Sequence, residues 1–281
     1  MNNSAENFTS PEVHPSTNFT TNDFSPFVGL RIGVLCFHLL SGVPIYAYVL
    51  WLIATRRNGV ASEFFNFNLN VCEIFFSLTS LAFLLSERFP GLMTLQRFLL
   101  GLAITVRPLF QCLICSERFM AVLHPVDFLK FKPFRYKIVC SVVVWLMGLG
   151  SCLFCMFSLL SFNMYAFTWF ILIQFLPFLF IQLFCCLAVL RALKQLGPGE
   201  RGRVGGEENH MKRKAFYLIL IITVTMVIMF TPFIVMGFLY ILQHDISVVL
   251  PISFICFILA GFVQPILYLH RAGKLSCFCS S

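Results

Sequence analysis

An acid and an arginine stand next to each other where a long apolar segment of the chain ends. The stretch reads Ser116-Glu117-Arg118-Phe119-Met120-Ala121-Val122-Leu123-His124-Pro125. A charged side chain is costly at the edge of a hydrocarbon layer, so the pair indicates a function at a membrane boundary. The Glu117 carboxylate can hold the Arg118 guanidinium by a charge-assisted hydrogen bond, and protonation of that carboxylate would release it. We therefore predict a switch here; the alternative is a fixed ion pair that anchors the helix at the lipid headgroups.

The composition excludes a water-soluble domain. Hydrophobic residues make up 59% of the 281 positions and charged residues only 11%, which is far from the average of soluble globular proteins. Histidines and cysteines do not group at the spacing of metal ligands, and no nucleophile, base and orienting acid can be placed together. We therefore expect neither an enzyme nor a bound metal or cofactor.

Charges and turn-forming residues divide the apolar sequence into seven predicted membrane spans. A span needs about 20 apolar residues at the rise of an α-helix. Residues 138–190 carry no Asp, Glu, Lys or Arg, and this stretch fits two helices joined by a turn at Ser161-Phe162-Asn163-Met164. The other predicted spans cover residues 33–55, 64–86, 91–122, 215–243 and 246–269. The predicted fold class is an all-α membrane protein, a bundle of seven transmembrane helices.

The basic residues predict how this bundle is oriented. Lys and Arg accumulate in cytoplasmic loops, and here most of them fall on the side that also holds the C-terminus. We therefore predict an extracellular disordered tail over residues 1–26, a seven-helix domain over residues 27–272 and a short cytoplasmic tail over residues 273–281. The net charge of +8 is then mostly a signal of topology, and no nucleic-acid partner is needed to explain it.

Both predicted tails carry candidate modification sites. Three N-glycosylation triplets begin at Asn2, Asn7 and Asn18, on the predicted outer side. Cys277 and Cys279 lie just past the last predicted span. S-palmitoylation is one interpretation of these two cysteines, and reduced, unmodified thiols are the other.

A set of short landmarks occurs in the predicted helices in a recognisable order. They are Glu117-Arg118-Phe119 with Ala121-Val122 and His124-Pro125, then Trp145, Pro177, Phe230-Thr231-Pro232-Phe233 and Gln264-Pro265-Ile266-Leu267-Tyr268. Together with seven spans and an outer N-terminus, this set resembles the rhodopsin-like class of G-protein-coupled receptors over residues 27–272. Within that class, Gly42-Val43-Pro44 and the Phe230 that replaces a tryptophan look most like the branch of nucleotide, protease-activated and small-acid receptors.

The resemblance implies a function. It implies a receptor of the plasma membrane that passes an extracellular ligand signal to a heterotrimeric G protein, with Glu117, Arg118 and Phe119 as the G-protein switch. Prolines inside helices remove a backbone hydrogen bond and bend the helix. The predicted activation hinges are Phe230, Pro232, Pro177, Gln264, Pro265 and Tyr268. The alternatives are a receptor-shaped membrane protein without G-protein coupling and a transporter or channel, although no internal repeat or polar half-helix is visible.

The sequence departs from the family pattern inside the bundle. Glu73 stands where the family has an aspartate of a sodium site, and Arg107, three helical turns from Arg118, stands where the family has a small polar sodium ligand. We predict that Arg107 pairs with Glu73 and that its fixed cation replaces the sodium ion. The alternative is that both charges face a water-filled cavity separately. Tyr46 and Gln264 also replace polar residues of the family.

Two further departures lie near the ends of the predicted helices. The family's outer disulfide begins in the third helix, where this chain has Met93, and the predicted outer loop over residues 161–168 has no cysteine. Lys212 stands where some receptors carry an acid that locks the triplet arginine. We therefore expect both the disulfide and that lock to be missing.

The sequence says less about the ligand. Arg97 is predicted near the outer end of the third helix and is a candidate contact for an anion; snorkelling to the outer headgroups is the alternative. A candidate apolar pocket beside it comprises Leu100, Ile104, Phe230, Phe233 and Phe254, although ordinary core or lipid-facing packing also explains each of them. The expected partners are a heterotrimeric G protein, membrane lipids and an extracellular ligand, a small anion or a lipid.

Overall fold

The structure is a computed structural model that describes residues 26–56, 59–86, 88–123, 134–195, 206–244, 246 and 248–272. Regular secondary structure in these residues is helical throughout. The predicted glycosylation sites Asn2, Asn7 and Asn18, the pair His124-Pro125, and the tail cysteines Cys277 and Cys279 lie outside the described residues.

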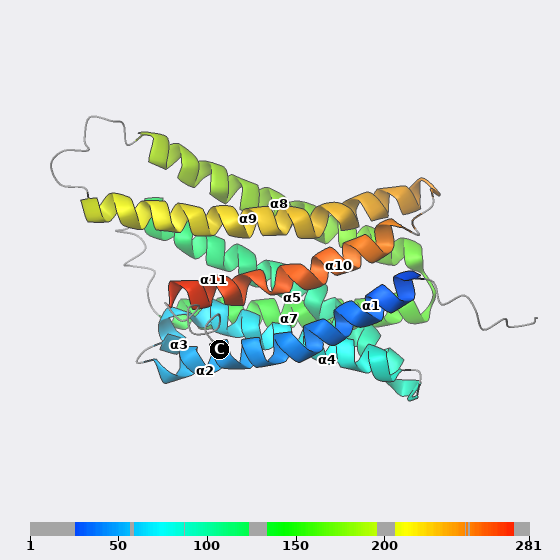
Figure 1. Cartoon of the computed structure of the whole chain (residues 1–281). Helices are drawn as coiled ribbons and strands as arrows, with labels where there is room; N and C mark the ends of the chain where they lie inside the picture. Colours follow the sequence, from blue (N-terminus) through cyan, green and yellow to red (C-terminus); the bar gives the residue numbers. More distant parts are fainter. Residues whose placement is uncertain are drawn as a thin grey trace, which may run out of the picture.

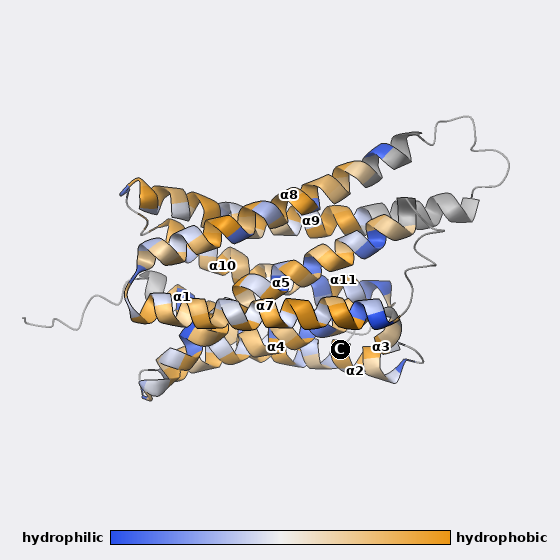
Figure 2. Cartoon of the chain, turned by 180° about the vertical axis from the view of Figure 1, so that it is seen from behind, coloured by the Kyte–Doolittle hydropathy of each residue, from blue (hydrophilic) through white to orange (hydrophobic). Residues whose placement is uncertain are grey.

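Seven helical segments are long and apolar enough to cross a membrane, which confirms the predicted fold class (Figure 1). Figure 2 shows apolar residues along most of the length of these helices. The elements are α1 (Pro26–Phe37), the π-helix η1 (His38–Gly42), α2 (Val43–Thr55), α3 (Gly59–Ser62), α4 (Phe64–Leu85), α5 (Gly91–Leu123), α7 (Phe134–Leu160), α8 (Met164–Gln195), α9 (Gly206–Ile241), α10 (Val249–Gly261) and α11 (Val263–Arg271).

The uncharged stretch of the sequence forms two helices, α7 and α8, that are joined at the predicted turn. Asn163 caps α8, because its Oδ1 accepts a hydrogen bond from the backbone N–H of Ala166 at 3.0 Å. Phe162 has a positive φ of 52°, which lets the chain reverse within a few residues. The predicted outer loop was too long: Met164 to Thr168 belong to the first turns of α8.

The first and last spans are not continuous α-helices. The first consists of α1, η1 and α2, and the last consists of α10 and α11. Pro265 lacks the N–H that would bond to the carbonyl of Gly261, and α10 ends at that glycine. The π turn η1 likewise ends at Gly42, two residues before Pro44, which is the second residue of α2. Both interruptions are therefore placed by prolines that the sequence shows.

Helix α5 is the centre of the bundle. It packs on α4, α7, α8 and α9, and its apolar part is the most buried of the seven spans. Gly101 allows the close approach of α5 to α7, since a Cβ at this position would collide with the backbone of Ser151. Side chains of α5 can therefore contact residues of four other helices, α4, α7, α8 and α9.

One end of the bundle carries a concentration of described basic side chains. It is formed by the ends of α2, α5, α8 and α11 and by the starts of α4, α7 and α9 (Figure 1). The described cations there are Arg56, Arg118, Arg135, Lys137, Arg191 and Arg271. We call this end the basic end.

Candidate functional site

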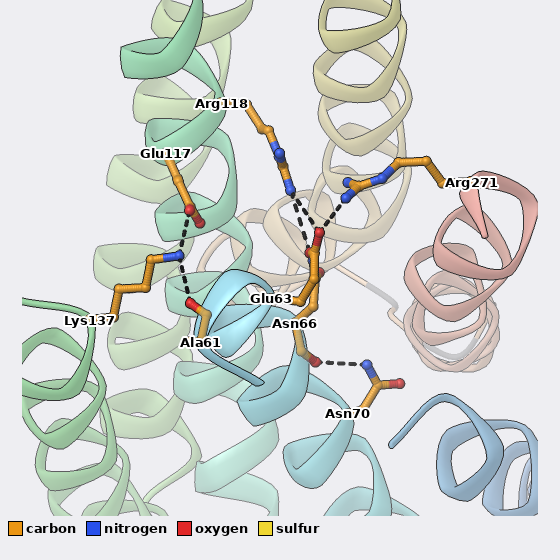
Figure 3. A network of polar contacts seen from close by, with 8 residues as sticks. All are labelled: Ala61, Glu63, Asn66, Asn70, Glu117, Arg118, Lys137 and Arg271. Atoms are coloured by element: carbon orange, nitrogen blue, oxygen red, sulfur yellow. Dashed lines mark hydrogen bonds and ion pairs between the residues drawn. The ribbon is translucent and has the colours of Figure 1, made fainter. Parts of the chain in front are cut away.

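Three side chains from separate parts of the chain meet at the basic end. Glu63 directly precedes α4, Arg118 lies in the last turns of α5, and Arg271 is the last residue of α11. Arg118 Nη2 lies 3.4 Å from Glu63 Oε2 and 3.5 Å from Oε1, and Arg271 Nη2 contacts Oε1. Figure 3 shows both guanidinium groups pointing at this one carboxylate. Glu63 therefore connects the ends of α4, α5 and α11.

The surroundings of Glu63 keep its carboxyl group ionised. Its side chain is only 7% exposed, and this burial acts to raise its pKa. The positive charges of Arg118 and Arg271 and the hydrogen bonds from Asn66 and Arg271 outweigh burial, so the pKa of Glu63 lies below its ordinary value. Asn66 Nδ2 donates to Oε2 at 2.5 Å. At neutral pH the two arginines thus face a negative charge.

Sequence reasoning did not single out Glu63. One local signal points to it: Glu63 is an acid placed directly before a helix start, where the helix dipole favours negative charge. Its loop also carries Arg56 and Arg57, so an acid stands out there. The contacts with Arg118 and Arg271, however, join residues that are far apart in the sequence and have no local signal.

The predicted hydrogen bond between Glu117 and Arg118 is wrong. Glu117 Oε1 instead accepts from Lys137 Nζ at 2.7 Å, and the same Nζ lies 3.3 Å from the carbonyl oxygen of Ala61 (Figure 3). Consecutive residues of an α-helix point about 100° apart, so neighbouring side chains do not face each other. Glu117 therefore joins α5 to α7 and α3, and a different acid holds Arg118.

A cleft lies beside the Glu63 contacts. It is small, with a volume of about 10 Å³, which is about the room that one water molecule needs, and its lining residues come from α4, α5 and α11. They are Asn66, Ile114, Arg118, Gln264, Leu267, Tyr268 and Arg271. Three residues of the predicted switch and hinge sets, Arg118, Gln264 and Tyr268, thus line one space.

The structure brings Glu73 and Arg107 together in the middle of the bundle. Arg107 Nε donates to Glu73 Oε1 at 2.6 Å, and Nη2 contacts Oε2. Arg107 Nη1 donates to the carbonyl oxygen of Phe257 at 2.8 Å. The guanidinium also lies between the rings of Phe76 and Phe257, 4.8 and 4.4 Å from their centroids. A two-pronged ion pair, a backbone acceptor and two aromatic faces together compensate the burial of this charge.

A glycine leaves the room that this ion pair occupies. A Cβ at Gly261 would lie 3.0 Å from both Arg107 Nη2 and Glu73 Oε2, and 3.1 Å from the hydroxyl of Tyr46. The first span adds a further polar group next to the pair: His38 in η1 lies 3.3 Å from Ser80 Oγ and 3.5 Å from the Tyr46 hydroxyl. The structure thus extends the predicted pair to the first and seventh spans, which sequence reasoning did not find.

The predicted hinge residues lie at the positions expected of them. Pro177 is inside α8, Pro232 is inside α9, and Pro265 follows the break between α10 and α11. The ring of Phe230 is fully buried and stacks on Phe175 at a centroid distance of 4.2 Å. These contacts join α8 to α9 through aromatic rings.

The candidate ligand residues lie around the half of α5 away from the basic end. Ile104 is buried in the main hydrophobic core, against which Leu100, Phe233 and Phe254 pack. Arg97 is half-buried and makes no hydrogen bond or ion pair within the described chain. Phe233 also contacts Phe175 and Phe257 edge-on, at 5.9 and 5.6 Å. The predicted apolar set is therefore part of the core packing around α5.

A comparison with protein families identifies the chain. The family described as "7 transmembrane receptor (rhodopsin family)" matches residues 47–268. The chain belongs to this family. A comparison with curated proteins found no match. The receptor is thus a multi-pass membrane protein, typically of the plasma membrane, and not an enzyme; its family signals through G proteins in response to extracellular ligands. The resemblance to one branch of the class stays a prediction.

Proposed function

We propose that this receptor passes an extracellular signal to a heterotrimeric G protein through release of Arg118 from Glu63. The observation that carries the proposal is the shared carboxylate: Glu63 contacts Arg118 of α5 and Arg271 of α11 simultaneously. The basic end faces the cytoplasm, in line with the distribution of Lys and Arg. In this arrangement the ends of three helices are held together on the side where a G protein binds.

Release of Arg118 gives the receptor its active form. A displacement of α5 or α11 relative to α4 separates the guanidinium groups from Glu63, and Arg118 then has donors to offer to carbonyl groups of the G protein. The prolines inside α8 and α9, Pro177 and Pro232, and the break between α10 and α11 before Pro265 permit such displacements without loss of the spans. Lys212 stands where some receptors carry an acid that locks the triplet arginine, and in this receptor Glu63 supplies the acid instead.

Basal G-protein activation in membranes tests the proposal. Glu63→Gln should raise the basal rate per receptor up to about fivefold, the change that a loss of about 1 kcal/mol from a partly exposed ion pair produces. Arg118→Ala should abolish activation. Arg135→Gln, at an exposed arginine of the same end, serves as the control and should leave the rate unchanged. Equal basal rates of the native receptor and Glu63→Gln, at equal surface amounts, would contradict the proposal.

The ligand proposed for the opposite end is a small anion or a lipid that contacts Arg97. Half-burial of this side chain without an ion-pair partner in the described chain supports that role, since a guanidinium in such a place favours an anionic partner. A screen of anionic metabolites, lipids and nucleotides should give hits that lose activity in Arg97→Ala. Hits that act equally on both forms would remove Arg97 from the ligand site.

A further inference from the structure

Helices α7 and α9 end in the same way at the end of the bundle opposite the basic end, which we call the outer end. The residue in the left-handed conformation is Phe162 after α7 and Gln243 after α9, with φ of 52° and 59°. The N–H of the following residue bonds to a carbonyl oxygen five residues earlier, from Asn163 to Ser158 and from His244 to Leu239, both at 2.9 Å. Glycine is the usual residue at the left-handed position of such a helix cap.

Phe162 is poorly suited to this position in water. A positive φ crowds the Cβ of every residue except glycine, and a bulky side chain makes the conformation rarer still. The residue is also 79% exposed, so packing inside the protein does not offset the strain. Gln243 has the same strained backbone, but its exposed amide can bond to water. Phe162 therefore calls for an apolar contact from outside the chain.

The surroundings of Phe162 indicate what covers its ring. Exposed apolar side chains lead to the turn from both helices, Phe157 and Leu160 on α7 and Tyr165 and Trp169 on α8. The members of each pair are three or four residues apart and share one face of their helix. Both helices are long and apolar enough to cross a membrane, so lipid covers these outward faces. Phe162 continues the lipid-facing surface to the outer end.

The length of α7 places the turn at the membrane surface. No charged residue follows Lys137 in this helix, and residues 138–160 span about 34 Å, slightly more than a hydrocarbon core of about 30 Å. The turn then falls in the headgroup layer at the outer end. Tyr and Trp rings prefer this layer, and Tyr165 and Trp169 lie in the first two turns of α8.

The backbone of the turn is suited to a layer that is poor in water. Unpaired amide groups are unfavourable there. Three N–H groups of the turn bond to carbonyl oxygens within it, from Ser161 to Phe157, from Asn163 to Ser158 and from Met164 to Phe162. These three amides need no water molecule as a partner.

We propose that the turn between α7 and α8 is a membrane anchor, in which the Phe162 ring inserts into the lipid headgroup layer at the outer end. The partner is the phospholipid surface itself. The left-handed backbone directs the ring outward, and its insertion holds the ends of α7 and α8 at a fixed depth. α9, in contrast, ends in a polar cap of the same geometry at Gln243. Membrane contact of this kind does not depend on coupling to a G protein.

Tryptophan fluorescence in phosphatidylcholine discs tests this contact. Phe162→Trp and Gln243→Trp each add one indole at an equivalent cap, and the emission of the native chain, which has three tryptophans, is subtracted. Phosphatidylcholine brominated in the upper part of its acyl chains should quench the added emission of Phe162→Trp more strongly than that of Gln243→Trp. Iodide dissolved in the water should quench the two variants in the reverse order.

Two outcomes of this experiment would overturn the anchor. Equal quenching of both variants by iodide would place the side chain at position 162 in water. Protection of Phe162→Trp from bromine and iodide alike would show that a protein surface, such as a second copy of the chain, covers the ring instead of lipid.

Glycine substitutions give a second test that adds no indole. Gln243→Gly removes only the strain of the left-handed position, so the thermal unfolding midpoint in the same discs should rise. Phe162→Gly removes the same strain together with the apolar contact of the ring, so its midpoint should rise less or fall. Equal rises of the midpoint in the two variants would contradict insertion of the ring.

Discussion

Arg107 and Glu73 face each other as a two-pronged ion pair in the interior of the bundle, and neither side chain reaches the surface to any extent. The pair joins α5 to α4, and the third guanidinium nitrogen reaches the backbone of α10 at Phe257. Opposite charges at this depth stabilise the fold only as long as both are present, because either one alone would be buried without compensation. This dependence can be measured.

Removal of one member of the pair should therefore cost more stability, relative to the charges removed, than removal of both. We expect Glu73→Gln or Arg107→Gln alone to lower the free energy of unfolding by about 3–5 kcal/mol, and the double variant to lose clearly less than the sum. The measurement is a double-mutant cycle on the thermal midpoint in detergent and on the amount of receptor at the cell surface. Strict additivity would show that the two charges act separately, as in the alternative of a shared water-filled cavity.

Because of this ion pair, we expect that sodium ions do not change the stability of the receptor. The Arg107 guanidinium already occupies both oxygens of Glu73, so a sodium ion finds neither a free carboxylate nor a favourable field there. The unfolding midpoint should be equal in sodium chloride and in N-methylglucamine chloride at the same ionic strength. A midpoint that rises with sodium in the native receptor, and not in Glu73→Gln, would contradict the idea that the fixed cation replaces the ion.

The contacts at the basic end predict different roles for two acids. Glu63 holds Arg118, whereas Glu117 holds Lys137. Glu117→Gln should accordingly raise basal G-protein activation much less than Glu63→Gln, and so should Lys137→Gln, which removes the same ion pair together with the contact to the Ala61 carbonyl. The comparison needs equal surface amounts of all four receptors. A larger effect of Glu117→Gln than of Glu63→Gln would support the original prediction that Glu117 and Arg118 form the switch.

These comparisons show what the sequence could predict. The seven spans follow from apolar runs, because a membrane imposes the same length requirement on every helix. The Glu73–Arg107 contact was also predictable, since two opposite charges at similar depth in adjacent spans have few other partners. The role of Glu63 was not predictable, because its contacts join α4, α5 and α11 and depend on how the helix ends assemble. The pairing of Glu117 with Arg118 failed because adjacency in sequence is not adjacency on a helix.

The lowered pKa of Glu63 predicts how acid affects the basic end. Because the pKa in the folded receptor lies below the ordinary value of 4.5, the contribution of this carboxylate to stability is complete above about pH 4.5 and is lost as the pH falls through the lowered value. The difference in unfolding midpoint between the native receptor and Glu63→Gln should thus stay constant from about pH 8 to about pH 6 and shrink only in stronger acid. A difference that already changes between those two pH values would mean that Glu63 titrates near neutrality.

Gly261 provides a test of the space around the central ion pair. In Gly261→Ala the new methyl group would lie 3.0 Å from Arg107 Nη2 and from Glu73 Oε2, with the Tyr46 hydroxyl on a third side at 3.1 Å. The pair is fixed by its two-pronged geometry and cannot yield easily, so we expect a loss of about 1–3 kcal/mol in the free energy of unfolding. Gly150→Ala is the matched control. It makes the same substitution within α7, where nothing lies within 4 Å of the added Cβ, and its effect should be neutral or slightly stabilising because alanine favours the helix. Thermal midpoints of the two variants in the same detergent decide the matter: equal midpoints would show that the pair tolerates the methyl group and is less rigid than its geometry indicates.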